Sequence, residues 1–306
     1  MPKEQILRLF HGKIREELES IQFEDIQEIR MRAERPVICI QNGKERILNE
    51  VVTLSDLKQI VEAVCGYSGY AFEEEISQGY LTIAGGHRIG LAGRVVQKEG
   101  KIQTIKYLSA LNIRVAHPVI GCAEKWDAYF YKNRKPCHTL IVSPPGCGKT
   151  TLLRDVLRMF SQGTEKYQGV TVGVVDERSE IAGTYRGRAS YDLGMRTDIL
   201  DGCPKSIGME LLLRTMSPAV IAVDEIGIGD VGAIENALRC GCKVIATLHG
   251  EKLEDYLEKP GFSSLVREKI FERIIFLENG QFPGVISTVY DRDFKILWEG
   301  KRCTSK

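Results

Sequence analysis

A lysine and two threonines follow a run of small residues near the middle of the chain, at a spacing that suits phosphate binding. The whole segment reads Ser143, Pro144, Pro145, Gly146, Cys147, Gly148, Lys149, Thr150 and Thr151. Glycines let successive backbone N–H groups converge on phosphate oxygens, and a following helix directs its positive end at the same anion. Lys149 would reach the β- and γ-phosphates, and the Thr150 hydroxyl would bind Mg²⁺. The segment predicts a site for ATP and Mg²⁺.

The first position of this loop departs from the usual pattern, because it holds Ser143 and not glycine. Serine is small, and this position shapes the turn more than it touches phosphate. The alternative is a Gly/Pro turn that happens to precede a lysine. A strand expected at Thr139–Val142 and a helix expected to begin near Thr150 favour the phosphate loop, since that loop lies between a strand and a helix.

A second chemical signal is an apolar run that ends in two acids. Val220–Val223 is followed directly by Asp224 and Glu225. At the carboxyl end of a sheet strand, Asp224 can bind Mg²⁺ while Glu225 faces the attacking water as its base. By itself the run could be a strand that enters a polar loop; the phosphate loop upstream favours the magnesium and water site.

Another apolar run, Val170–Val175, ends at Asp176 and Glu177. We expect Glu177 to add to the magnesium and water site, and Asp176 to do so through a water molecule. The alternative is a solvated loop in which these acids pair with Arg178. Both interpretations stay open from the sequence.

His249 ends a further apolar run, two residues after the hydroxyl of Thr247. An imidazole at this strand end could sense a γ-phosphate. A lone histidine is more often structural, so the sensor and the structural histidine remain equal alternatives.

Strands and helices alternate after Pro136, and the strands are nearly all apolar, as in a parallel sheet covered by helices on both faces. The expected strands are Thr139–Val142, Val170–Val175, Val220–Val223 and Val244–Ala246, and a hairpin is expected at Val285–Tyr290 and Phe294–Trp298. We therefore predict an α/β core.

The first part of the chain predicts a smaller α+β domain. Apolar residues spaced three and four apart favour one amphipathic helix over Lys3–Ile21, and Thr53 with Asp56 would cap a helix at Leu54–Cys65. From Tyr80 to Ala116 the pattern is that of strands. We place the division between residues 1–125 and 126–306.

Composition excludes several classes of protein. The 306 residues carry 42 basic and 41 acidic side chains, a net charge of +1, which removes the simplest electrostatic argument for a nucleic-acid partner and leaves only a local basic patch open. Nine scattered cysteines fit reduced thiols in the cytoplasm, and Cys240 with Cys242 lacks the further ligands of a zinc site. No apolar run approaches the ~18 residues of a membrane span, so any membrane association would go through partner proteins.

Taken together, the four strand-end motifs resemble the secretion and type IV pilus ATPase superfamily, whose motors carry such boxes in this order. Within it, the chain is similar to a family of stage III sporulation proteins of endospore-forming bacteria. The segments that carry this likeness are Glu28–Arg32, Arg88–Arg94, Asp176–Ile181 and Arg196–Lys205.

This resemblance implies a RecA-like P-loop NTPase core and a homo-oligomer, a hexameric ring, that hydrolyses ATP. It also implies a position on the mother-cell side of the membrane, bound to membrane proteins of a channel between mother cell and forespore. The chain has Gly227 where the pilus motors carry an arginine, and it lacks their tetracysteine zinc module. Arginine roles therefore do not transfer as a set.

A ring motor completes each site with cations, because charge on the transferring phosphoryl group must be neutralised. The resemblance points to Arg214 before the Asp224 strand, and to Arg88, Arg94 and Arg114 in the first domain. Each of these arginines could equally be a solvated or paired surface residue.

The sequence leaves three functions open. The first is an Mg²⁺-dependent ATPase ring that energises or assembles the channel. The second is a nucleotide-gated scaffold with little turnover. The third, a motor that translocates nucleic acid, is disfavoured by the charge balance. A small-molecule kinase fits less well, since the Asp224–Glu225 pair suits activation of water.

Overall fold

The computed structural model describes residues 2–66, 72–280 and 283–300. The chain divides into two compact units, Met1–His117 with Gly183–Ser190 and Pro118–Ala182 with Tyr191–Lys306. Sequence reasoning put the division after residue 125 and kept residues 183–190 in the second domain. The two units are described separately below.

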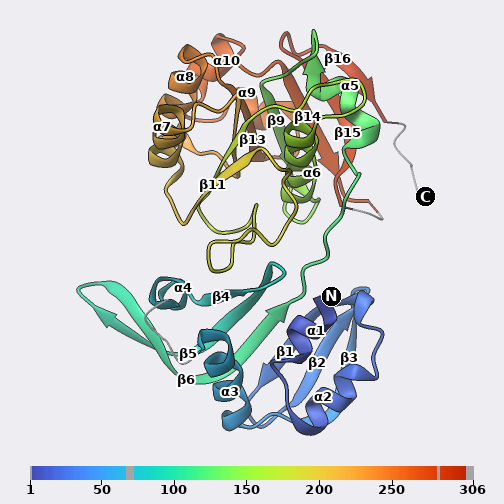
Figure 1. Ribbon diagram of the computed structural model, residues 1–306, viewed down its shortest axis with the longest axis vertical. Coiled ribbons are helices and arrows are strands. Elements are labelled where there is room, and N and C mark those ends of the chain that lie inside the picture. The colour runs from blue at the N-terminus through green and yellow to red at the C-terminus, as the bar shows by residue number, and fades with distance from the viewer. Residues whose placement is uncertain (1, 67–71, 281–282, 301–306) are drawn as a thin grey trace. The chain divides into compact units, whose positions relative to one another are not determined.

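The first unit is a six-stranded antiparallel sheet with short helices (Figure 1). Its strands lie in the order β3-β2-β1-β6-β5-β4. The elements are α1 (Pro2–Leu7), α2 (Gly12–Glu19), β1 (Ile26–Arg32), β2 (Pro36–Gln41), β3 (Lys44–Val51), α3 (Leu54–Cys65), α4 (Glu73–Ser77), β4 (Tyr80–Ile83), β5 (His87–Lys98) and β6 (Lys101–Arg114). A single core cluster holds the buried hydrophobic side chains of this unit, and its helices and antiparallel sheet give the expected α+β architecture.

Local sequence explains two features of the first unit. The one helix expected over Lys3–Ile21 is two helices, because Gly12 has a φ of +54°, in the left-handed region that glycine tolerates and that breaks a helix. The predicted cap of α3 is confirmed: Asp56 N–H donates to Thr53 Oγ1 at 3.1 Å, and Thr53 N–H donates to Asp56 Oδ2 at 2.8 Å.

The second unit is built on an eight-stranded sheet with the order β11-β10-β12-β13-β9-β14-β15-β16. The strands from β11 to β14 pair in parallel, and β15 and β16 are added as an antiparallel hairpin. The main elements are β9 (Thr139–Ser143), α6 (Lys149–Gln162), β10 (Val172–Asp176), β11 (Thr197–Asp201), α7 (Lys205–Thr215), β12 (Val220–Val223), α8 (Val231–Arg239), β13 (Lys243–His249), β14 (Arg273–Glu278), β15 (Val285–Asp291) and β16 (Ile296–Glu299). Shorter elements are η3 (Glu124–Trp126), α5 (Asp127–Phe130), β7 (Tyr131–Lys132), β8 (Lys135–Pro136), η4 (Ile228–Asp230), α9 (Leu253–Leu257) and α10 (Ser263–Arg267).

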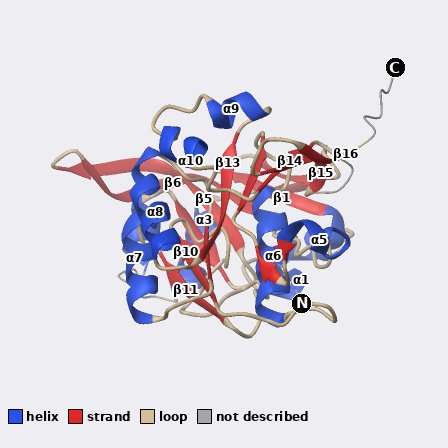
Figure 2. Cartoon of the chain, turned by 90° about the horizontal axis from the view of Figure 1, so that it is seen from above, coloured by secondary structure: helices blue, strands red, loops and turns tan. Residues whose placement is uncertain are grey.

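Helices cover both faces of this sheet, which is why its strands are apolar on both sides. Figure 2 shows α5 and α6 on one side of the strands and α7 and α8 on the other. Two buried clusters lie on these faces, one around α6 and the other around α7 and α8. The predicted α/β core and its strand runs are confirmed.

Candidate nucleotide site

The phosphate loop connects the end of β9 to the start of α6, so both of its ends are fixed by regular structure. Gly146 has a φ of +79°, and a Cβ at this position would meet no atom within 4 Å. The loop is therefore open where an anion would lie, with the amino end of α6 directed at the same place.

Lys149 lies on the first turn of α6 and is buried, at 7% exposure. Its ammonium donates to Ser143 O at 3.0 Å and to Pro144 O at 3.2 Å, folding back across the loop. A lysine carries three N–H donors. Within the described part of the chain the third has no acceptor, so a phosphate oxygen can take it.

The phosphate loop packs against Pro283 and Gly284, just before β15. A Cβ on Gly148, whose φ is +90°, would lie 2.4 Å from Gly284 N, so only glycine fits here. Gly284 N–H donates to Cys147 O at 2.8 Å, and the buried Cys147 thiol lies 3.2 Å from Asn279 Oδ1. These contacts hold the phosphate loop against the chain between β14 and β15 at Asn279 and Gly284.

Asp224 joins the phosphate loop to the sheet. Thr150 Oγ1 on α6 donates to Asp224 Oδ2 at 2.7 Å, and the hydroxyl of Thr247 on β13 donates to Asp224 Oδ1. Strand β13 lies between β12 and β9, and Val223 pairs with Ala246, so Thr247 is level with Asp224. A hydroxyl and a carboxylate in contact are suitable oxygen ligands for Mg²⁺.

Glu225 follows Asp224 and has a φ of +50°, in the left-handed region. Non-glycine residues in this region carry strain of roughly 1 kcal/mol or more and occur often at functional sites. Its N–H donates to Thr247 Oγ1 at 2.8 Å, which holds the bend in place. The bend leaves the Glu225 side chain exposed beside Asp224.

Asp176, at the end of β10, is 2% exposed and closes the loop that follows it. Its oxygens accept the N–H groups of Glu180, Ile181 and Ala182 at 2.7–3.0 Å. Burial raises the pKa of Asp176 to about 6, although the three N–H groups act in the opposite direction. This carboxylate therefore fixes the loop that presents Glu177 and Arg178.

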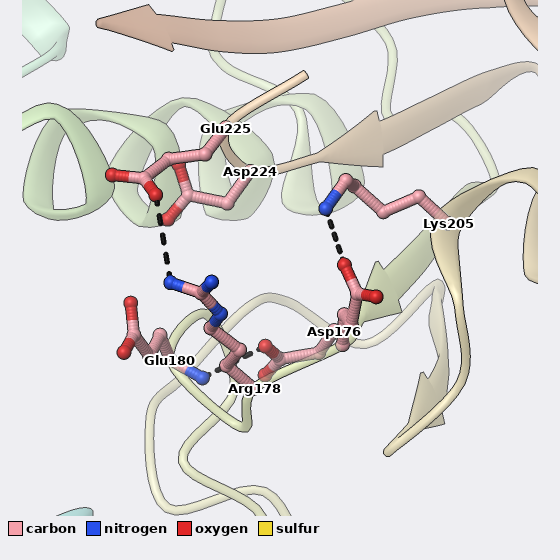
Figure 3. Close-up of a pocket in the computed structure, with 7 residues that line it drawn as sticks. Asp176, Arg178, Glu180, Lys205, Asp224 and Glu225 are labelled. Carbon is pink, nitrogen blue, oxygen red and sulfur yellow. Dashed lines mark hydrogen bonds and ion pairs between the residues drawn. The ribbon is translucent and has the colours of Figure 1, made fainter. Parts of the chain in front are cut away.

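Two ion pairs surround a pocket between the ends of β10 and β12, as Figure 3 shows. Arg178 Nη1 lies 3.7 Å from Glu225 Oε2, and the Lys205 ammonium, at the start of α7, donates to Glu177. Sequence reasoning considered Arg178 only as a partner of Asp176 and Glu177, and it gave Lys205 no role. Lys205 is the last residue of the segment Arg196–Lys205, which contains β11. The pairing of β11 with β10 brings it beside Glu177.

The structure places His249 and Arg214 differently. His249 ends β13, paired in register with Ser143 at the start of the phosphate loop, and its side chain is exposed. Arg214 is in the last turn of α7, about 14 Å along the helix axis from Lys205, and is exposed. His249 thus lies at the loop, whereas Arg214 lies at the far end of its helix.

The three arginines predicted in the first domain lie on β5 and β6. Arg88 pairs in register with Arg114, and Arg94 with Lys106. The Arg88 guanidinium lies 3.9 Å from the centre of the Tyr80 ring, and Arg114 Nε lies 3.7 Å from Glu28 Oε1. Arg94 and Arg114 are exposed. Their roles stay predictions.

Two kinds of feature are absent from the described residues. In that part of the chain, no group of three or more His, Cys, Asp or Glu side chains is placed to hold a metal ion by itself. Likewise, no helix of the described segments is long and apolar enough to cross a membrane.

A phosphate loop between β9 and α6, with an acidic strand end two strands away in the parallel sheet, is the arrangement of a RecA-like fold. Solved structures agree. The pilus retraction motor PilT with bound ADP matches with a TM-score of 0.60 at 14% identity, covering 95% of this chain and 84% of that one. The Legionella pneumophila ATPase DotB matches with a TM-score of 0.55 at 13% identity, covering 83% and 73%. These likenesses establish the fold.

The chain belongs to the family described as sporulation stage III, protein AA, whose model matches residues 1–297. It is 42% identical over 282 residues to the stage III sporulation protein AA of Bacillus subtilis (strain 168), covering 92% of each chain. It is also 28% identical over 131 residues to the uncharacterized protein ycf45 of Porphyra purpurea, 42% of this chain and 22% of that protein. The resemblance drawn from the motifs is confirmed.

Proposed function

We propose that this protein is an Mg²⁺-dependent ATPase that works as a ring, energising or assembling a channel between mother cell and forespore. The contact that carries the proposal is the bond from Thr150 Oγ1 to Asp224 Oδ2 at 2.7 Å, because it joins the phosphate loop to the acidic strand end. The family supports the role in sporulation, and the fold supports nucleotide binding.

The residues fit the bound groups by their chemistry. The open loop from Ser143 to Thr151 would hold the phosphates, with Lys149 on the β- and γ-phosphates, and Thr150 and Asp224 would bind Mg²⁺. Bound Mg²⁺ supplies positive charge that stabilises the transferring phosphoryl group. Glu225 would orient water and take its proton, with Glu177 beside it.

Cations from a neighbouring copy would complete each site. Arg88, Arg94, Arg114 and Arg214 are the candidates, and His249 is placed to respond to the γ-phosphate from its position beside Ser143. A homo-oligomer, a hexamer by analogy with related motors, follows from this requirement. Attachment to the cytoplasmic face of the membrane would go through channel proteins, with no nucleic acid involved.

Phosphate release tests the proposal. The purified chain should release phosphate from ATP with Mg²⁺ and stop when EDTA removes the metal, and light scattering should show a higher mass with ATP and Mg²⁺. Assembly with negligible phosphate release, even with the membrane partners present, would favour the nucleotide-gated scaffold. A chain that neither binds nucleotide nor assembles would refute both.

A further inference from the structure

The ion pair between Arg178 and Glu225 joins the residue proposed to activate water to a cation of the neighbouring loop. We propose that Arg178 exchanges partners: it holds Glu225 while the site lacks nucleotide and moves to the γ-phosphate when ATP binds. The inference rests on the proposed function, and it adds an arginine of the same chain to the cations expected from elsewhere.

The pair is weak enough to exchange. Its atoms are 3.7 Å apart, and the side chains of Arg178 and Glu225 are 66% and 53% exposed. Exposed pairs of this kind contribute little, because water screens them and both side chains lose freedom when they pair. The triphosphate offers a competing anion of higher charge.

Lys205 provides a contrast within the same pocket. It pairs with Glu177, its side chain is only 15% exposed, and its backbone begins α7. A cation that is mostly buried on a helix has little room to move. Lys205 therefore fixes Glu177, whereas Arg178, on a loop with a longer side chain, can change partners.

The position of Arg178 suits the γ-phosphate. Glu225 is next to Asp224, and Asp224 is bonded to Thr150 at the end of the phosphate loop. The guanidinium therefore pairs with the residue that directly follows Asp224, one of the proposed magnesium ligands. Its planar set of N–H donors can bind two phosphate oxygens at once. The pair with a carboxylate orients the guanidinium but uses only some of these donors. Departure of Arg178 would free Glu225 to accept a proton from water.

A double-mutant cycle tests the exchange on the full-length protein. The variants are Arg178→Gln, Glu225→Gln and the two combined. Isothermal titration would measure the Kd of two probes with Mg²⁺: AMP-PNP, which has a γ-phosphoryl group, and ADP, which does not. Arg239→Gln is the matched control, because Arg239 is also an exposed arginine and forms a pair of similar length with Glu235, at 3.8 Å on α8.

Arg178→Gln should weaken AMP-PNP binding by at least about tenfold, the effect of losing one charged hydrogen bond, and leave ADP binding nearly unchanged. Glu225→Gln should strengthen AMP-PNP binding about twofold to fivefold, since no ion pair has to be broken, and this gain should vanish in the Arg178→Gln background. Arg239→Gln should change neither affinity.

An equal gain from Glu225→Gln in both backgrounds would overturn the exchange, and so would an equal loss of AMP-PNP and ADP binding in Arg178→Gln. Failure of the unaltered chain to bind either nucleotide would instead refute the proposed function, and the inference with it.

Discussion

The two halves of the candidate site are held in different ways. In the phosphate half, Lys149 and Thr150 lie on α6, and Asp224 accepts hydrogen bonds from hydroxyl groups on α6 and β13. In the water half, Glu225 is exposed and its described ion-pair partner lies on a loop. The phosphate half is therefore formed before a ligand binds, whereas the water half depends on ion pairs that a ligand can replace. The first two variants below each act on one half.

Glu225→Gln should have the largest effect. Loss of the base should slow phosphate release by about 10²-fold or more, because general base catalysis contributes factors of that order. Nucleotide binding should persist, since the phosphate half is intact. Glu235→Gln on α8 removes another carboxylate that pairs with an arginine, outside the site, and should leave the rate unchanged. A normal rate in Glu225→Gln would show that another group activates water.

Lys149→Met should weaken nucleotide binding by the phosphate half. Methionine keeps the buried stem but lacks the ammonium, so affinity for Mg²⁺–ATP should fall at least about tenfold, the effect of losing a charged hydrogen bond. ADP affinity should fall as well, which distinguishes this variant from Arg178→Gln. Fluorescence titration gives both values. Unchanged ADP affinity would place the lysine away from the β-phosphate.

Thr247→Val should loosen the link between the halves. Valine has the same shape but cannot donate to Asp224 or accept the Glu225 N–H, so each of these two partners loses a part-buried hydrogen bond. We expect a loss of about 1–3 kcal/mol in the free energy of unfolding. Thr247→Ser, which keeps the hydroxyl, should lose less. Equal denaturation midpoints for the two variants would contradict this account.

Asp176 lies outside both halves, and its effect on stability has a pH signature. Its pKa is raised to about 6 in the folded chain from 3.8, so the folded state binds a proton more tightly than the unfolded state. The stability it contributes is full below pH 4 and is lost as the pH rises through 6, by about 1–3 kcal/mol. Asp176→Asn should remove that decline in urea titrations between pH 4 and 7. An identical pH dependence in both proteins would refute the assignment.

Much of the fold followed from the sequence because buried parallel strands are apolar runs. The strands that end at Asp176 and Asp224 were foreseen for this reason. Strand β11 was missed: Thr197–Asp201 has only two apolar residues, Ile199 and Leu200, and none of its side chains is fully buried, as suits an edge strand. The break at Gly12 was also missed, since the apolar spacing continues across it and a single glycine does not show its φ.

The sequence predicted the site only where the residues at a single strand end indicate a chemical role without knowledge of their neighbours in space. Parallel strands bring their carboxyl ends to one edge, so the meeting of Thr150 with Asp224 could be anticipated. The partners of the glutamates could not. Arg178 reaches Glu225 across two strand ends, and Lys205 reaches Glu177 from the start of a helix, so both pairs depend on the three-dimensional arrangement.

Hydrogen–deuterium exchange with two nucleotides tests the contrast between the halves most directly. With Mg²⁺–ADP, the loop of residues 143–150 should gain protection while residues 177–182 exchange as in the free protein. With Mg²⁺–AMP-PNP, both segments should be protected, because only a γ-phosphate draws Arg178 from Glu225. Equal protection of residues 177–182 by both nucleotides, or by neither, would contradict the account.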